Sequence, residues 1–112
     1  MNKKITVVFY RTEAGNEPVR EWLLDLDKED KKTIGVDIKT VEYVWHIGMP
    51  VSRSLGKGLY KMRSHISHKR IARVIFTIVD GYMVLLNGFI KKTQKTPKEE
   101  IALALKRMKE IK

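Results

Sequence analysis

The dipeptide Asp80-Gly81 constrains the fold of this chain more than any other short segment. It separates two runs that are rich in β-branched and aromatic residues, 71–79 and 82–90. An Asp-Gly pair between two such runs is the strongest short signal for a β-hairpin in the sequence. The second half of the chain is therefore expected to contain an antiparallel pair of strands.

The register of this hairpin decides which side chains share a face of the sheet. With a tight two-residue turn, Arg73 pairs with Gly88 and Lys91 points to the opposite face. A bulge near Gly88 would be needed to bring Phe89 and Lys91 to the side of Arg73.

A strand and two helices are expected before the hairpin. Residues 5–10 have the composition of a strand, and a helix with Pro18 in its first turn can be capped by Asn16 or Glu17. Asp27 followed by Asp30 resembles a cap for a second helix, which Gly48 and Pro50 would end. The apolar faces of the two helices consist of Val19, Trp22, Leu23 and Leu26, and of Ile34, Ile38, Val41 and Trp45.

A loop at 51–58, a strand at 59–63 and a polar loop at 64–70 are expected to follow. Thr96-Pro97-Lys98-Glu99 has the pattern of a capping box, which predicts a last helix. The inward side chains of that helix would be Ile101, Ala104, Leu105, Met108 and Ile111. The order βααβββα indicates an α+β fold, a small antiparallel-rich sheet packed on one side by helices. At 112 residues we expect one domain, 1–112.

The charge is strongly asymmetric along the chain. There are 23 Lys and Arg against 13 Asp and Glu, a net charge of +10. Residues 1–48 have a net charge of −1 and residues 49–112 a net charge of +11. Between Arg53 and Arg73 there are seven basic residues, two His and no carboxylate. This pattern predicts a polyanionic partner.

Several classes of site are excluded or disfavoured by composition. The absence of Cys excludes disulfides and Cys nucleophiles, and the basic half offers few carboxylates for a divalent metal. His65 and His68 could begin a zinc site, but only His46 remains as a further His ligand, so solvated loop residues are the simpler interpretation. We expect no metal and no cofactor. No apolar run approaches the roughly 20 residues of a membrane helix, so a cytoplasmic protein is expected.

The remaining candidates for chemistry are cations on strands. Lys61 and Arg63 share the strand face that is expected to point away from the helices, and Arg73 lies near the start of the next strand. Arg is suited to phosphate because its planar guanidinium contacts two oxygens at once. Phe89 precedes Lys91, Lys92 and Lys95, a combination that can stack a base and neutralise its backbone. Phe89 could equally be a core residue, and Lys95 a solvated side chain.

Three segments of this chain resemble the HigB/RelE-type toxins of bacterial type II toxin-antitoxin systems, in their phage-derived branch. These segments are Gly58-Leu-Tyr-Lys-Met-Arg63, Arg73-Val-Ile-Phe and Val84-Leu-Leu-Asn-Gly-Phe-Ile-Lys-Lys-Thr-Gln-Lys-Thr-Pro97, the last followed by Glu99 and Glu100. The resemblance covers nearly the whole chain, and its most specific part is the stretch from Gly88 to Pro97. It implies a RelE-like microbial ribonuclease-type fold and metal-free cleavage of mRNA in the ribosomal decoding site.

The resemblance also implies roles for individual residues. Arg63 and Arg73 would bind the scissile phosphate, and Lys91 or Lys92 would protonate the leaving oxygen or add positive charge. The RNA-binding residues would be Lys57, Lys61, Phe89 and Lys95. The branch commonly has Glu at the position of Lys61 and His at the position of Asn87, so the general base is left to Lys61 or His65.

Two alternative functions remain open at this stage. A related toxin could keep the fold and inhibit DNA gyrase, or the chain could be a non-catalytic basic nucleic-acid-binding module. For the toxin, the resemblance implies two partners: mRNA on the ribosome, and a cognate antitoxin with a helix-turn-helix domain. Toxin and antitoxin would form a hetero-oligomer.

Overall fold

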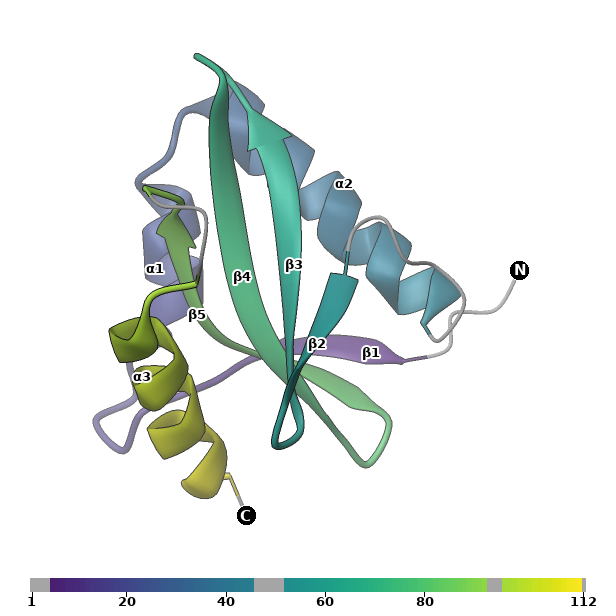
Figure 1. Cartoon of the computed structure of the whole chain (residues 1–112), viewed down its shortest axis with the longest axis vertical. Coiled ribbons are helices and arrows are strands. Elements are labelled where there is room, and N and C mark those ends of the chain that lie inside the picture. The colour runs from purple at the N-terminus through teal and green to yellow at the C-terminus, as the bar shows by residue number, and fades with distance from the viewer. Residues whose placement is uncertain (1–4, 46–51, 93–95, 112) are drawn as a thin grey trace.

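The computed structural model describes residues 5–45, 52–92 and 96–111. Its elements, in order, are β1 (Thr6–Phe9), α1 (Pro18–Leu24), α2 (Lys28–Val44), β2 (Ser52–Gly56), β3 (Leu59–Ile66), β4 (Arg70–Val79), β5 (Tyr82–Ile90) and α3 (Lys98–Lys109) (Figure 1). Within these residues five strands form one sheet in the order β1-β5-β4-β3-β2. β1 is parallel to β5, and the other neighbours are antiparallel. The α+β class and the antiparallel-rich sheet predicted from the sequence are confirmed.

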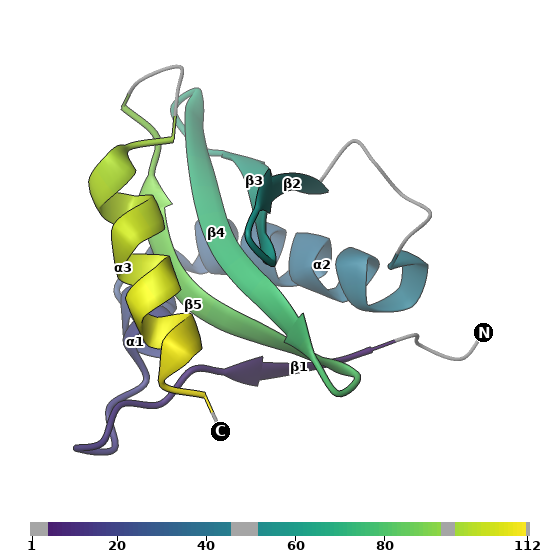
Figure 2. The ribbon, with the colours of Figure 1, turned by 60° about the horizontal axis from the view of Figure 1, so that its bottom comes forward.

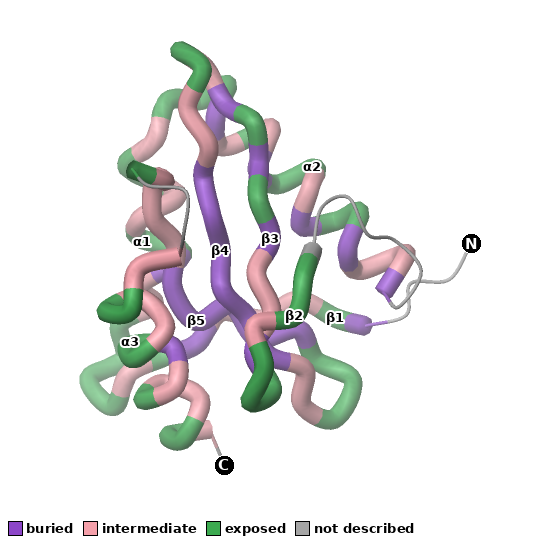
Figure 3. The backbone as a smooth tube through the Cα atoms, viewed as in Figure 1, coloured by how far each residue is buried: buried purple, intermediate pink, exposed green. Residues whose placement is uncertain are grey.

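Helices cover both faces of this sheet, so the expectation of helices on one side only is wrong. Figure 2 shows α3 on one face and α2 on the other. The first core cluster joins α1 and α2 to the sheet and includes Val19, Ile34, Val41, Met62, Val74, Phe76, Met83 and Leu85. The second joins α3 to the opposite face and includes Leu59, Ile75, Leu86 and Ala104. Residues 72–77 of β4 are all buried, as a strand covered on both faces requires (Figure 3).

The region between the second helix and the hairpin contains more strand than the sequence predicts. β2 forms within the expected loop at 51–58, and β3 continues to Ile66 within the expected loop at 64–70. β2 is an edge strand without a regular apolar alternation, and its backbone pairing with β3 holds it in place. The predicted helix end at Gly48 and Pro50 lies outside the described residues.

Neither predicted capping arrangement forms. Asp27 and Pro97 are the N-cap residues of α2 and α3, and neither makes a side-chain cap hydrogen bond. Asp30 is 1% exposed and accepts hydrogen bonds from Ser67 N (3.0 Å), Ser67 Oγ (3.0 Å) and Arg70 Nη2 (2.8 Å). These bonds tie α2 to the turn between β3 and β4. The carboxylate thus fixes a distant turn instead of its own helix end.

The β4–β5 hairpin contains a β-bulge, which determines whether Phe89 and Lys91 lie on the same face of the sheet as Arg73. Asp80 and Gly81 both have positive φ, at 49° and 81°, and Val79 pairs with Tyr82. The register shifts by one residue where Phe76 pairs with Leu85 and Ile75 pairs with Asn87. Leu86 is the extra residue, and beyond it Arg73 pairs with Phe89.

No helix in the described part of the chain is long and apolar enough to cross a membrane.

Candidate phosphate-binding face

Basic side chains from four neighbouring segments gather on the α3 side of the sheet. Arg53 of β2 pairs with Lys61 of β3, and one level along the sheet Arg63 of β3 pairs with Arg73 of β4. Directly paired residues project from the same face of a sheet. Phe89 of β5 pairs with Arg73, and Lys91 donates its backbone N–H to Ile71 (2.7 Å), which continues the same register. We call this set the basic face: Arg53, Lys61, Arg63, Arg73, Phe89 and Lys91.

The basic face has an exposed layer and a buried layer. Arg53 and Arg63 are exposed, while Lys61 and Lys91 are half-buried. Arg73 is only 3% exposed, although it lies directly beside Arg63. Arg63 can therefore meet a ligand directly, whereas the charge of Arg73 acts from beneath the surface.

Crowding of positive charge changes the acid–base properties of this face. Burial lowers the pKa of Lys61, and the charges of Arg73, Arg53, Arg63 and Lys91 lower it further. Burial also lowers the pKa of Arg73, with a smaller contribution from Arg63. An anion placed among these groups would relieve their mutual repulsion. The electrostatics of the face therefore favour the binding of an anion such as a phosphate.

The hydroxyl of Thr96 connects two of these cations to the start of α3. Thr96 Oγ1 accepts hydrogen bonds from Arg73 Nη1 (3.0 Å) and Lys61 Nζ (3.3 Å). The sequence pattern predicts a capping box at the start of α3 that includes Thr96. The two cations use its oxygen instead, and α3 begins at Lys98 after the N-cap residue Pro97.

Asn87 holds the first turn of α3 against the same face. Its Nδ2 donates to Glu100 Oε1 (2.8 Å) and to the backbone oxygen of Glu100 (3.3 Å). Asn87 is 3% exposed. The position at which the resembling toxins commonly carry His is therefore occupied by a residue that anchors a helix.

Some predicted residues do not join the basic face. Lys57 lies in the turn between β2 and β3, four residues from Lys61, which corresponds to about 13 Å along a strand. Lys92 is exposed and follows Lys91 beyond the end of β5. Lys95 lies outside the described residues.

Two members of the site could not be found from the sequence. Arg53 was placed in a loop, because β2 has no clear strand pattern, and only the pairing with Lys61 brings it to the face. Thr96 has the pattern of a helix cap, so its contacts with Lys61 and Arg73 have no local signal. His65, two residues after Arg63 on β3, lies on the same side of the strand and is exposed.

The described residues contain no group of three or more His, Asp or Glu side chains that could hold a metal ion. His65 lies on β3, and His68 lies in the turn that follows.

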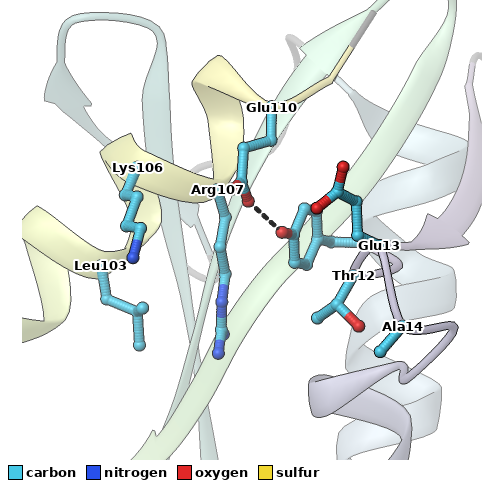
Figure 4. A pocket seen from close by; sticks show the side chains of 8 residues that line it. Thr12, Glu13, Ala14, Leu103, Lys106, Arg107 and Glu110 are labelled. Atoms are coloured by element: carbon cyan, nitrogen blue, oxygen red, sulfur yellow. Dashed lines mark hydrogen bonds between the residues drawn. The ribbon is translucent and has the colours of Figure 1, made fainter.

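A cavity of about 330 Å³ lies away from the basic face, between the C-terminal half of α3 and the loop after β1 (Figure 4). Tyr10 Oη donates a hydrogen bond to Glu110 at its edge. This bond, together with burial, raises the pKa of Tyr10. Arg107 lies 5.6 Å from the centre of the Tyr10 ring and donates to the backbone oxygen of Leu86 (2.7 Å). These contacts anchor the C-terminal end of α3.

One known family matches most of the chain. The family described as Phage derived protein Gp49-like (DUF891) matches residues 21–109. The chain therefore belongs to this family of phage-derived, RelE/HigB-type toxin-like proteins. No curated protein matches the chain. A toxin-like family of this kind generally implies an antitoxin partner.

Proposed function

We propose that this protein is the toxin of a type II toxin-antitoxin pair and cleaves mRNA in the ribosomal decoding site without a metal ion. The observation that carries the proposal is the direct pairing of Arg63 with Arg73 on a face that also presents Phe89 and Lys91. Two guanidinium groups beside an aromatic ring suit a phosphate and the base next to it. Membership of the toxin-like family supports the same function.

The proposed reaction uses a nucleophile that the RNA supplies. The 2′-oxygen attacks the adjacent phosphorus, the bond from phosphorus to the 5′-oxygen breaks, and a 2′,3′-cyclic phosphate and a 5′-hydroxyl result. Arg63 binds the phosphate oxygens, and Arg73 adds positive charge from beneath as negative charge develops. The protein must also accept the 2′-hydroxyl proton and deliver one to the 5′-oxygen.

Lys61 and Lys91 are the groups we assign to proton transfer. The lowered pKa of Lys61 increases its neutral fraction, which can accept the proton of the 2′-hydroxyl. Lys91 protonates the leaving 5′-oxygen. Asn87 takes no part in proton transfer, since an amide does not titrate and its Nδ2 is bound to Glu100. Phe89 stacks on a base of the bound codon.

The proposed partners follow from the same assignment. The mRNA is presented by the ribosome, and a cognate antitoxin with a helix-turn-helix domain binds the toxin and neutralises it. Co-expression with a small helix-turn-helix protein encoded beside the toxin should restore the growth that the toxin alone arrests.

The test is cleavage of an end-labelled mRNA on programmed ribosomes, followed by identification of the new ends. We expect a 2′,3′-cyclic phosphate and a 5′-hydroxyl, no cleavage when the nucleotide at the cut is 2′-deoxy, and no cleavage without ribosomes. Arg63→Ala should lose activity by a factor of about 100 or more. Lys39→Ala, which removes one exposed positive charge from α2 on the other face of the sheet, is the matched control.

Three results would contradict the proposal. These are cleavage of naked RNA, products with a 5′-phosphate, and intact mRNA accompanied by inhibition of DNA supercoiling. The last result would assign the protein to gyrase inhibition.

A further inference from the structure

The hydroxyl of Thr96 lies at the centre of the basic face, yet it serves neither the helix cap nor any role assigned above. Its oxygen accepts from Arg73 Nη1 at 3.0 Å and from Lys61 Nζ at 3.3 Å. A hydroxyl oxygen has two acceptor lone pairs and one hydrogen to donate. Both acceptor positions are taken by cations, so the remaining function of this hydroxyl is to donate.

The chemistry of the surroundings limits what can accept that hydrogen. Within the described part of the chain, no residue accepts a hydrogen bond from Thr96 Oγ1. Thr96 is only half-buried, so a ligand on the basic face can reach it. Two positive groups bound to the oxygen polarise the O–H bond and favour an anionic acceptor.

We propose that Thr96 is a phosphate-contacting residue whose hydroxyl donates to a non-bridging oxygen of the RNA phosphate held by Arg63. The inference rests on the proposed function in taking RNA as the source of the phosphate. In this arrangement Arg73, at 3% exposure, is a positioning residue that acts on the ligand through Thr96. Thr96 thus couples the buried charge of Arg73 to a ligand bound at the surface.

Two substitutions separate the hydroxyl from the shape of the side chain. Thr96→Val keeps the branched shape and removes the hydroxyl, while Thr96→Ser keeps the hydroxyl and removes the methyl group. Binding is measured without ribosomes, by fluorescence anisotropy, with a short single-stranded RNA made uncleavable by 2′-O-methyl groups. Thermal denaturation checks that each variant is folded.

We expect Thr96→Val to weaken binding by a factor of about 10 to 100, as for a hydrogen bond to a charged group, and Thr96→Ser to restore most of the affinity. The salt dependence gives a second readout. Because Thr96 is neutral, Thr96→Val should leave the slope of log K against log salt unchanged. Arg63→Ala should reduce that slope by about 0.7, the value for one phosphate contact on a single strand.

Three outcomes would overturn the inference: unchanged affinity of Thr96→Val, equal losses for Val and Ser, or a reduced salt slope for Thr96→Val. The last would mean that Thr96 acts only by placing Lys61 and Arg73. These outcomes are distinguishable from failure of the proposed function. A wild-type protein that binds RNA but leaves ribosomal mRNA intact would contradict the proposed cleavage and not the phosphate contact of Thr96.

Discussion

The backbone of Gly88 lies directly against the indole ring of Trp22. A Cβ at Gly88 would lie 2.4 Å from both Cε3 and Cζ3 of that ring. Trp22 belongs to α1, while the next residue of β5, Phe89, pairs with Arg73 on the opposite face. The packing of α1 is thereby linked to the strand segment that presents the basic face.

Gly88→Ala should be destabilising, because the added methyl group has no room unless Trp22 or β5 moves. Overpacking of this kind costs about 1–3 kcal/mol. Urea denaturation measures the loss, and RNA binding should weaken as well, because β5 carries Phe89.

Gly35→Ala is the matched control, since the position is inside α2 and a Cβ there meets nothing within 4 Å. It should stabilise the protein by up to about 1 kcal/mol, from helix propensity alone. Equal effects of the two substitutions would show that the contact with Trp22 does not decide the outcome.

Asp30→Asn should lower the stability at neutral pH and flatten its dependence on pH. Hydrogen bonds from the backbone and the hydroxyl of Ser67 and the charge of Arg70 lower the pKa of Asp30, against the opposing effect of burial. A carboxyl group whose pKa is lower in the folded state stabilises the fold above its unfolded pKa of about 3.9. That contribution disappears as the pH falls through the folded pKa.

Urea denaturation at several pH values between neutral and strongly acidic checks this prediction. Asp27→Asn removes the same charge from the N-cap of the same helix, where no side-chain cap hydrogen bond forms, and should have little effect. If the free energy of unfolding of the wild type and of Asp30→Asn falls equally as the pH is lowered, Asp30 has no role in the pH dependence.

Lys61→Met should stabilise the fold and weaken RNA binding at the same time. Because the pKa of Lys61 is lowered, the unfolded chain binds more protons than the folded protein at alkaline pH. The free energy of unfolding of the wild type should therefore rise as the pH increases from the folded pKa toward the unfolded value of about 10.4. Lys61→Met should lose this rise.

The same variant should bind RNA with a salt slope smaller by about 0.7. Lys39→Met, on the exposed side of α2, is the control and should change neither the alkaline stability nor the slope. A less stable Lys61→Met protein would contradict the prediction, since it would mean that Lys61 contributes favourable contacts that outweigh its repulsion.

Phe89→Leu should separate packing from base stacking. Phe89 packs partly against the core cluster beneath α3, and Leu preserves much of that contact while losing the aromatic face. Stacking of a base on an aromatic ring contributes about 1–3 kcal/mol, so affinity for single-stranded RNA should fall roughly ten-fold or more. Phe89→Tyr keeps the ring and should bind normally, and equal affinity of the Leu and Tyr variants would exclude stacking.

Local signals in the sequence identified most of the elements but not the contacts between them. Asp80-Gly81 predicts its hairpin because the turn is specified by two adjacent residues. β2 was missed because Ser52–Gly56 is held by its neighbour β3, a contact that no local pattern encodes. Asp30 and Thr96 look like helix caps, and each instead binds partners far away in the sequence.

The candidate site was predictable to the extent that it follows strand alternation. Lys61 and Arg63 lie two residues apart on β3, so their shared face follows from the pleat. The side of the sheet covered by α3 and the depth of Arg73 depend on tertiary packing, and neither has a sequence signature.

The bulge at Leu86 determines which side chains of β5 lie beside Arg73. If the same residues paired without this bulge, the hairpin and its turn could be retained, but Arg73 would pair with Gly88, and Phe89 and Lys91 would face α1. Two relatives could then share the fold and nearly the same composition while only one of them had a site. We therefore expect the register of β5 against β4, and not composition alone, to decide which members of the family carry the basic face.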